Sequence, residues 1–60
     1  MSAVQINDYA QRLYSAHGDQ AEYEAAQRAK ASAERGNDTE AEQWRKVREA
    51  IRLIRGPNAS

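Results

Sequence analysis

Three glycines, Gly18, Gly36 and Gly56, divide the chain into alanine-rich stretches, and each stands where a helix would end. Glycine adopts positive φ without steric cost, and it is therefore the commonest residue just after a helix. Two of these glycines are followed directly by signals for a new helix. Asp19 and Asn37 are residue types that favour the N-cap position, and each has a glutamate three places on. The sequence predicts three helices joined by very short turns, over about residues 3–17, 19–35 and 38–55. The first helix begins either at Ser2, which forms a capping-box pattern with Gln5, or at Asn7, which Asp8 follows.

Short turns between consecutive helices favour antiparallel neighbours. We therefore expect an all-α fold, a small antiparallel three-helix bundle. The alternative arrangement is a long hairpin of the second and third helices with helix one packed across it. Sixty residues allow one domain, residues 1–60, in which residues 56–60 form a short tail.

Helical periodicity indicates which side chains face inward. The third helix places its large apolar side chains in one sector, and it is the expected core builder: Trp44, Val47, Ala50, Ile51 and Ile54. The first helix gathers Ile6, Ala10, Leu13 and His17 on one side, and the second presents Ala21, Ala25, Ala26, Ala29, Ser32 and Ala33. Half of the 24 apolar residues are alanine, so the core must be small.

The composition limits how the fold can be stabilised and indicates where in the cell the protein is found. With no cysteine, the chain has neither a disulfide nor a thiolate metal site, which leaves helix packing, self-association or docking on a partner. The longest apolar run is far too short to span a bilayer, and residues 1–20 lack a basic leader followed by a hydrophobic segment. We expect a cytoplasmic protein with no membrane contact.

Charge is unevenly distributed along a chain whose formal net charge is zero. Residues 19–43 carry seven acids and three bases, a sum of −4, whereas residues 44–56 carry five bases and one acid, a sum of +4. Binding to nucleic acid depends on net positive potential, which the acidic middle third opposes. Nucleic acid is therefore a disfavoured partner.

The most specific surface pattern is a row of four arginines on the third helix, spaced by three, four and three residues: Arg45, Arg48, Arg52 and Arg55. This spacing places them along one side of the helix. The row borders Trp44, and Arg48 lies one turn further on, where its guanidinium is expected to stack on the indole. Surfaces that combine arginine and tryptophan are typical of binding hot spots. The simpler interpretation is a solvated face whose arginines pair with Glu22 or Glu49.

Signals for chemistry are weak. His17 is the only histidine, and the sequence has no cysteine, so His17 has no second histidine or thiolate with which to bind a metal. The sequence has no glycine-rich phosphate loop and no serine in a nucleophile-elbow motif. We expect no catalytic residue, no cofactor, no metal and no small-molecule substrate, and hence no enzymatic activity.

Two segments, LYSAHGDQAEYEAAQRA from Leu13 to Ala29 and AEQWRKVREAIRLIRGP from Ala41 to Pro57, resemble a group of short, uncharacterised bacterial proteins of about 60 residues. The resemblance covers most of the chain. It implies an all-helical, free-standing bacterial protein, and it transfers no activity and no site residue.

The function expected from these residues is that of a small non-enzymatic interaction protein. Its arginine and aromatic face on the third helix would bind an acidic protein surface or a second copy of the chain, as in a homodimer. The alternative is contact with RNA or DNA through the same arginine row. A structural or regulatory subunit of a larger assembly is a third class consistent with the sequence.

Overall fold

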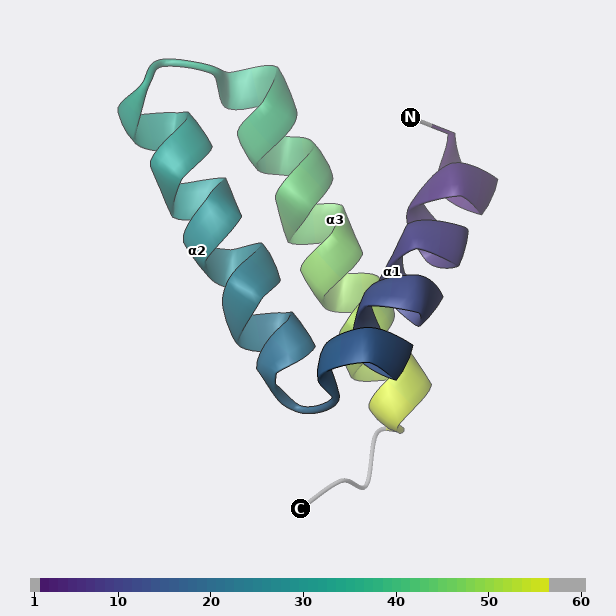
Figure 1. Ribbon diagram of the computed structural model, residues 1–60. Coiled ribbons are helices and arrows are strands. Elements are labelled where there is room, and N and C mark those ends of the chain that lie inside the picture. Colours follow the sequence, from purple (N-terminus) through teal and green to yellow (C-terminus); the bar gives the residue numbers. More distant parts are fainter. Residues whose placement is uncertain (1, 57–60) are drawn as a thin grey trace.

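The computed structural model describes residues 2–56, without the side chain of Ala3. These residues form three helices, α1 (Ala3–His17), α2 (Gln20–Glu34) and α3 (Asp38–Arg55), shown in Figure 1. The predicted bounds of α1 and α3 are confirmed, and α2 is one residue shorter at each end. Residues 57–60 of the predicted tail lie outside the described part of the chain.

Local capping chemistry accounts for the two ends of α1. The Ser2 hydroxyl accepts a hydrogen bond from the Gln5 backbone N–H at 3.2 Å, and the Gln5 side-chain oxygen accepts one from the Ser2 N–H at 3.0 Å. This reciprocal capping box satisfies two of the backbone donors that a helix start leaves unpaired. At the other end, Gly18 adopts φ +60° and donates its N–H to the Tyr14 carbonyl at 2.7 Å.

The turn between α2 and α3 is also the one that the sequence predicts. Gly36 adopts φ +79°. The Asn37 side-chain oxygen caps α3 by accepting the Glu40 backbone N–H at 3.2 Å, while its amide donates to the Glu40 carboxylate at 2.9 Å. Because these contacts are local, a short sequence pattern suffices to specify them.

The predicted cap at the start of α2 is wrong. Asp19 stands at the N-cap position in the right-handed helical region, and its side chain makes no capping hydrogen bond. The Asp19 carboxylate instead lies 3.7 Å from Nε of Arg55, and the carboxylate of Glu22 also contacts arginines of α3. Arginines of α3 thus contact both carboxylates that the pattern assigned to a capping box.

The helices pack as the expected three-helix bundle. Contact is most extensive between α2 and α3, and α1 contacts α3 more than α2. Figure 1 shows α2 and α3 as antiparallel neighbours, with α1 inclined against them at the end where α2 begins and α3 ends. The chain directions of α1 and α3 are therefore similar, and α3 has neighbours on two of its sides.

All three helices contribute to one small core of buried side chains: Ile6, Ala10, Ala21, Ala25, Val47 and Ile51. Val47 and Ile51 are the largest apolar side chains that are completely buried, which confirms α3 as the core builder. Leu13, Tyr14, Trp44, Ala50 and Ile54 pack around this core and are partly buried. The many alanines allow the helices to approach closely, but they bury little side-chain volume.

Two residues expected on inner faces are exposed instead. His17 lies outside the core, with its Nδ1 atom 3.1 Å from Oε2 of Glu24. Ala33 is exposed as well, because the contact face of α2 follows the narrower arc of Ala25, Ala29 and Ser32. A run of alanines on a helix is wider than the strip that one neighbouring helix covers, so its edge remains in solvent.

Candidate partner-binding surface

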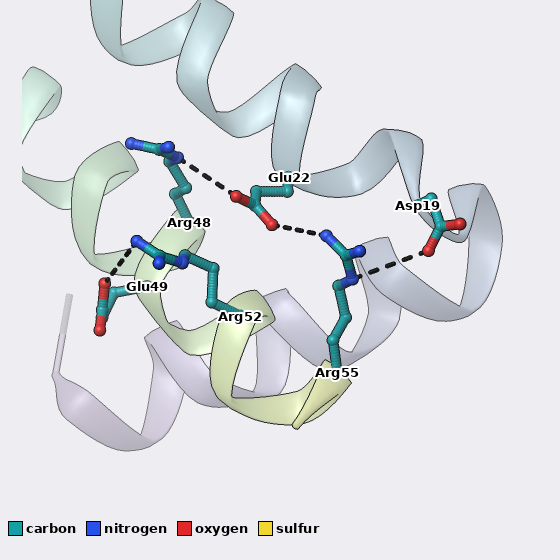
Figure 2. Close-up of polar contacts among 6 residues, drawn as sticks. All are labelled: Asp19, Glu22, Arg48, Glu49, Arg52 and Arg55. Carbon is teal, nitrogen blue, oxygen red and sulfur yellow. Dashed lines mark hydrogen bonds and ion pairs between the residues drawn. The ribbon is translucent and has the colours of Figure 1, made fainter. Parts of the chain in front are cut away.

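Glu22 of α2 lies between Arg48 and Arg55 of α3, as Figure 2 shows. Arg55 donates from Nη1 to Oε1 of Glu22 at 2.8 Å, while Nε of Arg48 lies 3.6 Å from Oε2 of the same carboxylate. The Glu22 side chain is only 21% exposed, so this contact is partly shielded from water. These ion pairs join α2 to α3, and their first role is therefore within the fold.

A shallow hollow of about 320 Å³ adjoins these ion pairs, lined by Asp19, Glu22, Tyr23, Ala26, Arg48 and Arg55. Its two carboxylates balance its two guanidinium groups. A site that attracts a charged ligand needs a surplus of the opposite charge. The hollow has no such surplus, and we assign it no ligand.

Arg45 and Arg52 lie elsewhere on α3. Nη1 of Arg52 is 3.9 Å from Oε2 of Glu49 one turn earlier on the same helix, and both side chains are more than half exposed. Arg45 is exposed and forms no ion pair with any residue in the described part of the chain. The structure therefore divides the predicted arginine row: Arg48 and Arg55 contact α2, whereas Arg45 and Arg52 point to solvent.

Trp44 contacts a different arginine from the one expected. Cζ of Arg28, on α2, lies 5.1 Å from the centre of the indole, and the Tyr9 ring of α1 meets it edge-on at 5.5 Å. The indole Nε1 also donates to Oε1 of Glu40 at 3.4 Å. The predicted stacking of Arg48 is wrong, because the Glu22 carboxylate draws that guanidinium towards α2. Trp44 thus links all three helices and is only half-buried.

The face of α3 that points away from the core was not identified as a unit by the sequence pattern. Its side chains are all exposed: Glu42, Arg45, Lys46, Glu49, Arg52 and Leu53. Leu53 is the one large apolar side chain among them, and it is 68% exposed. We call these six residues the outward face. Helical periodicity alone could have defined it as the complement of the Val47 and Ile51 sector.

Residues 2–56 contain no cluster of three or more histidine, aspartate or glutamate side chains placed to hold a metal ion. Within the same range, no helix has the length and apolar character needed to cross a membrane. Comparison of the chain with protein-family models, with curated proteins and with solved structures finds no match. The resemblance to short bacterial proteins stays a prediction.

Proposed function

We propose that this chain is a small non-enzymatic interaction protein, and that the outward face of α3 is its binding surface. The observation that carries this proposal is that one side of α3 is buried in the core and the other side is exposed. Its inner face supplies Val47 and Ile51 to the core, while its outward face leaves two arginines and Leu53 exposed. Arginine is enriched at protein interfaces and at their hot spots, and Leu53 adds apolar area to the same face.

The chemistry of the outward face indicates the class of partner. Arg45 and Arg52 are the two members of the arginine row that no acid of α2 engages. They are available for bidentate hydrogen bonds to carboxylates, which guanidinium geometry favours. The proposed partner is accordingly an acidic protein surface or a second copy of this chain, which itself carries exposed glutamates.

Nucleic-acid binding is the weaker proposal. It would draw on all four arginines of the row, because phosphate affinity grows with the number of phosphates that the protein neutralises. Arg48 and Arg55 already contact Glu22, so a phosphate would have to displace a carboxylate that is nearby and partly shielded. Of the row, Arg45 and Arg52 remain, and they lie with Lys46 on a face that also carries the exposed acids Glu42 and Glu49.

A binding experiment with matched charge reversals tests the proposal. The immobilised wild-type chain captures partners from a bacterial extract, and the affinity of each purified partner is then measured by calorimetry. The double variant Arg45→Glu and Arg52→Glu should weaken binding by about tenfold or more. The control variant Arg12→Glu and Lys30→Glu makes the same change in net charge on exposed positions of α1 and α2. Equal binding by both variants would contradict the proposed surface.

A further inference from the structure

Four of the five charged side chains on the outward face follow an ordered pattern, in which the fifth, Lys46, takes no part. Glu42, Arg45, Glu49 and Arg52 alternate in sign at intervals of three, four and three residues. They form two pairs, Glu42 with Arg52 and Arg45 with Glu49, and both pairs have their midpoint at position 47. With a rise of about 1.5 Å per residue, the members lie about 7.5 Å and about 3 Å on either side of that point along the helix axis.

Such a pattern is complementary to itself when the helix is reversed. We propose that two copies of this chain associate through the outward faces of α3, with the helices antiparallel and a two-fold axis beside position 47. Glu42 then lies level with Arg52 of the second copy along the helix axis, and Arg45 lies level with its Glu49, within reach of these long side chains. Because a two-fold interface repeats each contact, the two pairs become four. This inference rests on the proposed function and narrows the partner to a second copy.

The same four charges disfavour the opposite orientation. In a parallel pair in register, each residue meets its own copy, so glutamate would face glutamate and arginine would face arginine. Antiparallel α3 helices also oppose their macrodipoles, and they bring the acidic first turn of one helix, with Asp38 and Glu40, near the basic last turn of the other. These four charges therefore favour the antiparallel orientation with the axis beside position 47.

The fold leaves room for this contact. The outward face lies on the side of α3 opposite the completely buried Val47 and Ile51, so α1 and α2 stand behind each α3 helix. The side chains that would pair are accessible, since Arg45 has no ion pair among residues 2–56 and Arg52 has only a 3.9 Å contact on its own helix. Leu53 lies at the flank of the face and would cover the methylene groups of Glu42 from the second copy.

The interaction must be weak and sensitive to salt. Exposed ion pairs contribute little each and are screened by ions, and Leu53 is the only large apolar side chain on the outward face. Analytical ultracentrifugation up to about 1 mM protein should show the average mass rising with concentration. Raising the salt from about 0.05 to about 0.5 M should weaken the association several-fold, because the Debye length falls with ionic strength.

Two single variants test the register. In Glu42→Arg, arginine faces Arg52 of the second copy, and in Arg52→Glu, glutamate faces Glu42, so each chain alone should lose about tenfold in self-association. Mixed in equal amounts, the two variants form a heterodimer in which all four facing pairs have opposite charge. The mixture should therefore recover the association of the wild-type chain.

A second mixture serves as the control. Glu42→Arg mixed with Arg45→Glu has the same net charges as the first mixture but leaves two of the four facing pairs with like charge. It should not recover association. Equal recovery in both mixtures, or self-association unchanged in the single variants, would overturn the register. A monomeric wild-type chain at every concentration would overturn the inference, while the proposed binding of an acidic partner would still be tested by the capture experiment.

Discussion

Replacing Ile51 by alanine should destabilise the bundle far more than replacing Leu53, although the two positions are two residues apart on α3. Ile51 is completely buried among residues of all three helices, whereas Leu53 is 68% exposed. Both substitutions delete three carbon atoms. In a core, deletion of such a side chain costs about 2–5 kcal/mol from lost transfer energy and the remaining cavity. On the surface the change is within about 0.5 kcal/mol.

The magnitude matters because a chain of this size has little stability to lose. At about 0.05–0.15 kcal/mol per residue, 60 residues have an unfolding free energy of about 3–9 kcal/mol, so Ile51→Ala removes much or all of it. Urea unfolding followed by circular dichroism, at micromolar concentration where copies do not pair, measures both variants. Ile51→Val, expected to cost about 0.5–1.5 kcal/mol, gives a graded value if the alanine variant does not fold. Equal losses at positions 51 and 53 would refute the division of α3 into inner and outward faces.

Two further predictions test contacts for which the structure and the sequence patterns give different answers. Asn37→Ala should cost about 1 kcal/mol in urea unfolding, because it removes a cap, whereas Asp19→Ala should cost less than about 0.5 kcal/mol, because that side chain caps nothing. Comparable losses would contradict the assignment of the caps. Arg28→Ala should shift the fluorescence of Trp44 and cost about 0.5–1 kcal/mol, while Arg48→Ala should leave the emission unchanged; the reverse outcome would restore the sequence-based pairing.

Helix bounds and inner faces could be predicted because their causes are local or periodic. The capping residues Ser2 and Asn37 act within three residues of their own positions. The glycines at the turns are specified by a backbone angle that other residues adopt only with strain. The sector of Val47 and Ile51 follows from helical spacing alone, and the structure buries both completely.

The contacts that could not be predicted join residues far apart in sequence. Asp19 matches a capping pattern, yet it lies near Arg55, and only the packing of α2 against α3 brings the two together. Trp44 has Arg48 one turn away on its own helix, but the guanidinium that lies over its indole belongs to Arg28 of α2. Helical spacing describes one helix at a time, so it places the arginine row on one side of α3 without revealing which members Glu22 occupies.

Methyl NOE spectroscopy of the dilute protein tests most directly the claim that one side of α3 builds the core and the other remains free. The methyl groups of Val47 and Ile51 should show contacts to Ile6 of α1 and to Ala25 of α2, whereas those of Leu53 should show none to either helix. Strong contacts from Leu53 to α1 or α2, or no contact from Ile51 to either, would contradict the account.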